Sequence, residues 1–239
     1  MNIILFDKLD EINTLSMNDE RARHIKKILK LKIGDSFSAG IINSVKGNAI
    51  IKEINNEKIV FSFVPETTEK DTLHPLTLIM AFVRPICMKR ILREAVSLGV
   101  EKIILSGADL TEKSYSKANF YVKEEYKKVL IDGAMQAAQT SISEVIIKNN
   151  IQDAIREIDN SYDKLLLDNV LKGKSLSEYE VKNNKSVIAI GPERGFSQRE
   201  RKLFVANGFT SYTIGKRVLR SETASCAAIA LTLSKMKLI

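Results

Sequence analysis

The chain lacks the residues from which disulfide frameworks and metal clusters are built. Its 239 residues include only two cysteines, Cys87 and Cys226, a number that forms neither and is typical of a protein kept in a reducing cytosol. The two histidines, His24 and His74, lie far apart in the sequence, so a multi-histidine metal site is not expected. The sequence therefore predicts a protein without a bound metal, and Cys226, among small residues, is interpreted as a core residue.

Long apolar segments are also missing. No apolar run approaches the length that a helix needs to cross a bilayer. The opening residues 1–7 are too short for a signal peptide and are interrupted at Asp7. We therefore expect a soluble, cytoplasmic protein that does not act at a membrane.

Positive charge is in excess. Lysine and arginine number 37 against 29 for aspartate and glutamate, which gives a formal net charge of +8. This balance favours a polyanionic partner such as nucleic acid. Hydrophobic residues make up 44% of the chain, enough for a packed core, and the length fits one large domain or two modest ones.

Residues 1–70 are predicted to form a small, mostly β domain. Short runs of β-forming residues alternate with turn residues, which is typical of a small barrel. Residues 65–71 are polar and without apolar periodicity, so they are the expected linker. The strands are expected at 3–6, 36–42, 49–54 and 58–64, with a hairpin turn at 46–48.

One helix is expected in this first domain, after a cap at residues 16–19 and before Gly34. Its apolar side is predicted to carry Ile25, Ile28 and Leu29. The polar side carries basic residues whose spacing can follow a nucleic-acid backbone, although a solvated helix face explains the pattern equally well. These basic residues are Arg23, Lys26, Lys27 and Lys30.

Residues 73–239 show a different pattern, in which apolar segments of strand length alternate with helical ones. The near-continuous apolar run at 76–83 is typical of a strand buried on both faces. The alternation predicts an α/β domain built on a mainly parallel sheet. Further strands are expected at 102–105, 144–147, 164–167, 187–190 and 212–214, and helices at 88–98, 120–138, 151–158, 197–207 and 222–235.

Two glycine-containing loops near the C-terminal end stand out. Each follows a predicted strand and precedes a helix, and the first helix begins with a capping box formed by Ser197 and Glu200. The carboxyl ends of parallel strands are where ligands bind, so the two loops outline a pocket. Neither loop matches a nucleotide-phosphate motif. The expected ligand is a planar base held by backbone groups between apolar walls, although both loops can also be ordinary connections. The walls are Ile190, Ile214 and Leu219.

Charged residues in these loops have both structural and chemical interpretations. Arg220 can clamp a phosphate or a carboxylate, or it can pair with Glu193. Glu193 can serve as an acceptor for backbone N–H groups. Glu222 lies at the start of the last helix, where the helix dipole favours a carboxylate.

The two loops resemble the signature of a known family. Residues 191–197 read GPERGFS, where the RsmE family of 16S rRNA (uracil-N3)-methyltransferases, in the SPOUT superfamily, has Gly-Pro-Glu-Gly-Gly-Phe/Leu-Ser. Residues 214–224 read IGKRVLRSETA and are similar to that family's second motif, Leu-Gly-x-Arg-Ile/Val-Leu-Arg-x-Glu-Thr-Ala. Weaker similarity extends to residues 24–35 and 97–100.

The resemblance implies a PUA-like β-barrel over residues 1–70 and a SPOUT methyltransferase domain with a C-terminal trefoil knot over residues 73–239. It implies a homodimer that binds S-adenosylmethionine and methylates N3 of a uridine in 16S rRNA or the small ribosomal subunit. Arg220, Glu193 and Glu222 become the candidate catalytic residues, and Arg194 joins the candidate RNA-binding residues. The cofactor site implied comprises Leu167, Ile190, Gly191, Gly195, Ile214, Gly215, Val218, Leu219, Arg220 and Thr223.

The chain departs from the family pattern where the family carries arginines or a Glu-Gln pair. It has no arginine near its N-terminus, has Arg194 in the place of a glycine, and has Ala138 and Ile142 in the middle of the second domain. These departures concern the RNA-facing positions more than the cofactor loops. Three alternatives therefore stay open: a SPOUT methyltransferase of another RNA, a non-catalytic RNA-binding module, and a ribosome-assembly factor.

Overall fold

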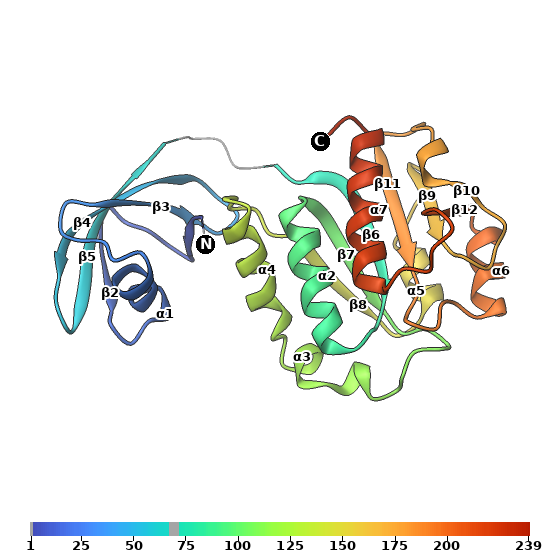
Figure 1. The fold of residues 1–239 in the computed structure, drawn as a ribbon, viewed down its shortest axis with the longest axis horizontal. Coiled ribbons are helices and arrows are strands. Elements are labelled where there is room, and N and C mark those ends of the chain that lie inside the picture. The colour runs from blue at the N-terminus through green and yellow to red at the C-terminus, as the bar shows by residue number, and fades with distance from the viewer. Residues whose placement is uncertain (1, 67–71) are drawn as a thin grey trace. The chain divides into compact units, whose positions relative to one another are not determined.

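The computed structural model describes residues 2–66 and 72–239 (Figure 1). Contacts divide these described residues into two compact units. The first lies within Met1–Thr72 and adds Ala134–Ile142, and the second comprises Leu73–Gly133 with Ser143–Ile239.

The first unit is a five-stranded sheet in the order β1-β3-β4-β5-β2, with one short helix. Its core forms where alternate strand residues such as Phe37, Ile51 and Phe61 point to the same side as Ala22 and Ile25 of the helix. The elements are β1 (Ile4–Phe6), β2 (Ile12–Ser16), α1 (Glu20–Arg23), a π-helical turn (His24–Ile28), β3 (Ser36–Ile41), β4 (Lys46–Ile54) and β5 (Lys58–Pro65).

The predicted helix of this unit is shorter than expected and its apolar side is different. Asp19 caps it, because its side chain accepts the N–H of Arg21 at 2.8 Å. The wider π-helical turn then shifts the following side chains around the axis. Ile25 is buried, but Ile28 is 68% and Leu29 is 38% exposed, so only Ile25 of the predicted apolar side packs into the core.

The hairpin turn predicted at residues 46–48 is also misplaced, because β4 already begins at Lys46. Gly47 is needed for close strand packing rather than for a turn, since a Cβ there would lie 2.2 Å from the carbonyl oxygen of Val64. The chain reverses before it, where Asn43 adopts a positive φ of 57°. Strand β2 was not predicted.

The second unit is built on a seven-stranded sheet in the order β10-β12-β9-β11-β6-β7-β8. Its paired strands run parallel throughout, which confirms the predicted sheet type. The strands are β6 (His74–Ala81), β7 (Val100–Ser106), β8 (Glu144–Lys148), β9 (Tyr162–Leu167), β10 (Lys174–Ser175), β11 (Lys185–Ile190) and β12 (Thr210–Thr213).

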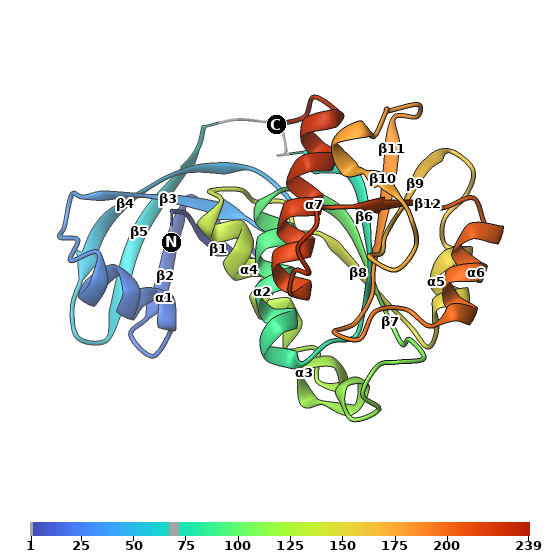
Figure 2. The same cartoon turned by 45° about the vertical axis from the view of Figure 1, so that its right-hand side comes forward.

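Helices cover both faces of this sheet (Figures 1 and 2). On one face α5 (Ile151–Arg156) and α6 (Gln198–Ala206) pack over a core that includes Ile79, Val187 and Phe204. On the other face α2 (Pro85–Ser97) lies beside α7 (Ser221–Lys235), and the Ser225 hydroxyl of α7 contacts the Met80 sulfur at 3.7 Å. The chain therefore changes faces between α6 and α7, along the connection that contains the second glycine loop.

The predicted helix at 120–138 is interrupted. It forms α3 (Asn119–Val122) and α4 (Tyr126–Gln136), and Glu124 between them has a positive φ of 53°. Two 3₁₀ turns, Tyr115–Lys117 and Leu176–Glu178, complete the elements. In the part of the chain that the structure describes, no helix has both the length and the apolar character required to span a membrane.

Candidate active site

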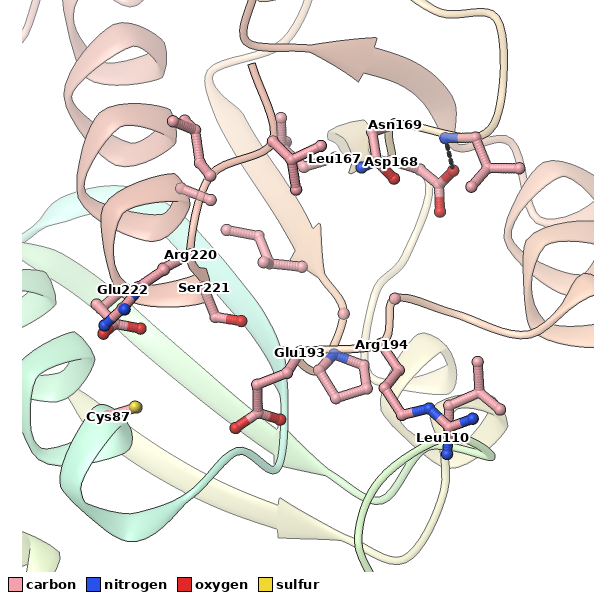
Figure 3. A pocket seen from close by; sticks show the side chains of 18 of the residues that line it. Cys87, Leu110, Leu167, Asp168, Asn169, Glu193, Arg194, Arg220, Ser221 and Glu222 are labelled. Carbon is pink, nitrogen blue, oxygen red and sulfur yellow. Dashed lines mark hydrogen bonds between the residues drawn. The ribbon is translucent and has the colours of Figure 1, made fainter.

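Three strands of the second unit end at one cavity. The loops that follow β9, β11 and β12 line a pocket of about 1040 Å³, together with the start of α2, residues 109–113 and Tyr115 (Figure 3). Strands β9, β11 and β12 are neighbours in the sheet, so their carboxyl ends meet at the same edge. This is the position at which open α/β sheets bind ligands.

The loop after β11 uses its two glycines for different reasons. A Cβ on Gly191 would lie 3.1 Å from backbone atoms of Gly195 and Phe196, closer than an ordinary van der Waals contact, so a side chain there would press on the loop. Gly195 has a positive φ of 69°, and its N–H donates to the carbonyl of Pro192 at 2.8 Å. Phe196 is buried in the core below the loop.

The predicted capping box starts α6 and also anchors a second wall of the cavity. The Glu200 carboxylate accepts the Ser197 N–H at 2.8 Å with one oxygen and the Asp109 N–H at 2.8 Å with the other. The Ser197 hydroxyl in turn contacts the Asp109 carboxylate at 2.5 Å. Hydrogen bonds to Arg199 and Ser197 hold the pKa of Asp109 below its ordinary value.

The loop after β9 is fixed by a buried carboxylate. Asp168 follows Leu167 directly, and one of its oxygens accepts the N–H groups of Val170 and Leu171 at 2.8 and 2.9 Å. The other oxygen accepts the Arg201 Nε–H at 2.8 Å. Sequence reasoning missed both members of this pair. The position of Asp168 immediately after a predicted strand is a signal that could have identified this residue, but nothing in the sequence links it to Arg201 on α6.

The loop after β12 leads into α7. Gly215 has a positive φ of 66°, and Val218 is 81% exposed at the mouth of the cavity. Arg220 is the N-cap residue of α7, and its carbonyl accepts the Ala224 N–H at 2.8 Å.

The structure brings nearly all of the predicted cofactor residues to this cavity. Thr223 is the exception, because it is exposed on α7 and does not line the pocket. The predicted residues that do line it are Leu167, Ile190, Gly191, Gly195, Ile214, Gly215, Val218, Leu219 and Arg220.

Two carboxylates and a thiol gather near the start of α2 (Figure 3). Glu193 accepts the backbone N–H of Arg84 at 3.1 Å, and no ion pair joins it to Arg220 in the described residues. Glu222 is 16% exposed at its side chain and lies 3.9 Å from Arg90. Burial raises the pKa of the Cys87 thiol, and Glu222 and Glu193 raise it further because negative charge disfavours the thiolate. Nothing in the sequence connects Cys87 with these acids.

The basic residues predicted for the first domain are exposed in the first unit. Lys26 is anchored, because its Nζ donates to the Asn55 carbonyl at 3.1 Å and to the Asn56 side chain at 3.2 Å. Arg23 lies 4.0 Å from Glu20, and Lys27 is exposed. Lys30 falls after the helical segment, with a positive φ of 54°. Arg194 belongs to the second unit and lines the cavity.

The chemistry of the cavity is that of a small-molecule site with mixed walls. Backbone groups of glycine loops and apolar side chains form one part, and charged groups form the other. Among the described residues, no cluster of three or more His, Cys, Asp or Glu side chains is placed to hold a metal ion.

Comparison with known proteins identifies relatives for both units. Residues 69–233 match the RNA methyltransferase domain family, and residues 18–64 match the RNA methyltransferase PUA domain. Ribosomal RNA small subunit methyltransferase E of Treponema pallidum is 38% identical over 98% of this chain and 91% of its own length. Ribosomal RNA small subunit methyltransferase E 1 of Borreliella burgdorferi is 36% identical over 99% of both chains.

Solved structures share the fold over nearly the whole length. A ribosomal RNA small subunit methyltransferase E from Neisseria gonorrhoeae, bound to S-adenosyl methionine, superposes with a TM-score of 0.81 at 21% identity, covering 98% of this chain and 97% of its own. A putative methyltransferase from Legionella pneumophila, also solved with this cofactor, gives 0.83 at 21% identity with the same coverage. These matches confirm the predicted fold class, an α/β domain on a parallel sheet preceded by a PUA-like β domain.

Proposed function

The chain belongs to the ribosomal RNA small subunit methyltransferase E family, and from this premise we propose that it transfers a methyl group from S-adenosylmethionine to N3 of a uridine in 16S rRNA. The observation that carries the proposal is the single cavity formed by the glycine loops after β11 and β12 and the loop after β9. The RNA substrate is inferred from the names of the relatives, and the cavity is a cofactor site of suitable size and chemistry.

The residues of the cavity fit a nucleoside cofactor. Its volume of about 1040 Å³ exceeds what a drug-sized ligand requires, which leaves room for a substrate base beside the cofactor. Ile190, Ile214 and Leu219 offer apolar contacts to a planar ring. Gly191 and Gly195 keep the backbone free of side chains, so a ligand can approach the main chain closely. When bound, S-adenosylmethionine supplies an electrophilic methyl group.

The residues of the chain then have three tasks. They hold uridine N3 in line with the methyl group, which is the largest contribution expected in a transfer between two bound partners. They accept the N3 proton, for which Glu193 and Glu222 are the candidates in the cavity. They stabilise the uridine anion or a neighbouring phosphate, and we assign this task to Arg220 at the N-cap of α7.

The two units divide the work in this proposal. Residues 1–70 bind RNA through the exposed basic residues Arg23, Lys26, Lys27 and Lys30, and residues 73–239 carry out the transfer with Arg194 as an added RNA contact. The net charge of +8 supports a polyanionic substrate. We further propose that the protein acts as a homodimer in the cytoplasm, on 16S rRNA or on the small ribosomal subunit that contains it.

Calorimetric titration with S-adenosylmethionine tests the cofactor site. The wild-type protein should bind saturably, and Gly195→Trp should abolish binding because an indole would fill the cavity at a residue of positive φ. Gly208→Trp is the matched control, since Gly208 also has a positive φ, of 83°, but does not line the cavity. Equal binding by the wild-type protein and Gly195→Trp would contradict the assignment.

Variants of the charged residues test the catalytic roles. Arg220→Ala should abolish methyl transfer while the fold, measured by circular dichroism, is unchanged. Glu193→Gln and Glu222→Gln should differ, because only the variant of the true proton acceptor loses the rise of rate with pH. Unaltered turnover in Arg220→Ala would refute its role.

A further inference from the structure

Arg201 is the buried cation of the cavity. It is 9% exposed, whereas the other arginines and lysines that line the cavity in the described residues, Arg84, Lys113, Arg194, Arg217 and Arg220, are all exposed. A buried guanidinium is costly unless its charge and its N–H groups find partners. Its position therefore requires an explanation.

Only part of the Arg201 guanidinium is satisfied by protein groups. Its Nε–H donates to Asp168 at 2.8 Å, but within the part of the chain that the structure describes neither Nη atom has a hydrogen-bond partner. The fully buried side-chain atoms that lack a hydrogen-bond partner all belong to other residues, so both Nη atoms remain accessible. Nη2 lies beside Gly195, 3.4 Å from the position that a Cβ on this glycine would occupy. The unpaired donors thus belong to the cavity wall, next to the glycine loop.

Asp168 holds this guanidinium in one orientation. The Asp168 side chain is 2% exposed, and its two oxygens already accept the Val170 N–H, the Leu171 N–H and the Arg201 Nε–H. Both Asp168 oxygens are thus engaged within the protein, and Asp168 acts on Arg201 as a positioning residue. Because the pair joins the loop after β9 to α6, it also fixes one cofactor loop against another.

We propose that Arg201, oriented by Asp168, binds the carboxylate at the amino-acid end of S-adenosylmethionine through its two Nη groups. This inference rests on the proposed function. A guanidinium fork matches a carboxylate with two parallel hydrogen bonds, and such charge-assisted pairs are stronger than neutral ones. The carboxylate is the negatively charged group of the cofactor, so it is the group that a buried arginine recognises.

RNA phosphate has the same anionic oxygens but does not fit this position. Arg201 lies beside Gly195 of the glycine loop and pairs with Asp168 of the loop after β9, and a phosphate within a chain of nucleotides cannot reach a side chain that is 11% exposed. The exposed arginines at the cavity, such as Arg194 and Arg217, are the ones available to a polynucleotide. Arg201 is left for a small ligand that enters the cavity.

Binding of two cofactor fragments separates this role from a purely structural one. The probes are S-adenosylhomocysteine, which has the amino-acid end, and 5′-methylthioadenosine, which keeps the adenosine but lacks the carboxylate. Calorimetric titrations compare the wild-type protein with Arg201→Met, Arg201→Lys and Asp168→Asn. Lys202→Met, a change of the same charge at an exposed neighbour on α6, is the control.

Arg201→Met should bind S-adenosylhomocysteine about tenfold to a hundredfold more weakly, the range expected for loss of hydrogen bonds between charged groups. Its affinity for 5′-methylthioadenosine should stay within about twofold of wild type, which also shows that the cavity is intact. Arg201→Lys, which keeps the charge but not the fork, should fall between, and it decides the question if Arg201→Met does not fold. Asp168→Asn should weaken S-adenosylhomocysteine less than Arg201→Met does.

Equal weakening of both probes in the arginine variants would overturn the proposal, because the contact would then not involve the carboxylate. Unchanged affinity for S-adenosylhomocysteine would overturn it as well. In both cases the cofactor site itself would stand, since the wild-type protein binds. Failure of the wild-type protein to bind either probe would overturn this proposal together with the proposed function.

Discussion

Replacement of Glu200 by Gln should both destabilise the second unit and loosen the cavity. Glu200 is 1% exposed, and its carboxylate accepts the N–H of Ser197 and that of Asp109, each at 2.8 Å. Glutamine keeps the size of the side chain but has one acceptor oxygen, so its amide group must face one of the two N–H groups.

The magnitude follows from these two hydrogen bonds. A hydrogen bond to a charged group contributes about 1.5–3 kcal/mol, and a buried N–H left without an acceptor costs about 1–3 kcal/mol. We therefore expect the free energy of unfolding of Glu200→Gln to fall by about 2–4 kcal/mol. For a domain of this size that corresponds to a decrease in Tm of roughly 4–16 °C. Asp109 and Gly195 line the cavity, and both lie next to the capping box in contact or in sequence. Loosening of the box should therefore lower the cofactor affinity as well.

Urea unfolding monitored by circular dichroism measures the first effect, and calorimetric titration with S-adenosylmethionine measures the second. Glu178→Gln is the control, because Glu178 closes a capping box of the same kind with Ser175 but is exposed. The free energy of unfolding of Glu178→Gln should fall by less than about 1 kcal/mol. A decrease of less than about 0.5 kcal/mol in Glu200→Gln would contradict this expectation, since it would mean that neither N–H group needs the buried carboxylate.

Three further predictions concern other buried or crowded groups. Burial raises the pKa of Asp163, but hydrogen bonds from the Lys182 N–H, Tyr179 and Asn183 outweigh this effect and hold the pKa below its ordinary value. The stability that Asp163 contributes is therefore fully present above the pKa of the unfolded state, about 3.9, and is lost as the pH falls through the lower pKa of the folded state. The difference in urea-unfolding free energy between wild type and Asp163→Asn should therefore shrink below about pH 4, and a constant difference would contradict this. Glu222→Gln should lower the pKa of Cys87 and speed its alkylation by iodoacetamide at a fixed pH near 8; an unchanged rate would show that Glu222 does not act on the thiol. Gly191→Ala should weaken S-adenosylmethionine binding more than Gly208→Ala, because its Cβ would press on backbone atoms at 3.1 Å, and calorimetry would refute this if both variants bound as wild type does.

The sequence predicted those parts of the cavity in which the interacting residues are only a few positions apart. The capping box of Ser197 and Glu200 needs residues only three positions apart, and the structure contains it. Gly195 and Gly215 adopt a positive φ within their own loops, so what they require is local as well. Patterns of this range depend on short segments, so they are visible in the sequence.

Contacts between distant segments were not predictable in the same way. Gly47 suggested a turn, but its true requirement is the backbone of Val64 in the next strand. The break at Glu124 has no glycine or proline to announce it, and Tyr121, whose hydroxyl donates to the Val83 carbonyl at 3.0 Å, holds the helix before it. Asp168 and Arg201 lie 33 positions apart, and only the fold shows that they form one buried pair.

The most direct test of the account is identification of the methylated nucleoside. The purified protein is incubated with methyl-labelled S-adenosylmethionine and with small ribosomal subunits, or their free RNA, from cells that lack the modification, and the RNA is digested and analysed by mass spectrometry. Label is expected in N3-methyluridine from 16S rRNA, and Gly195→Trp should abolish it. Label in another nucleoside or another RNA, or no label with a protein that binds the cofactor, would contradict it.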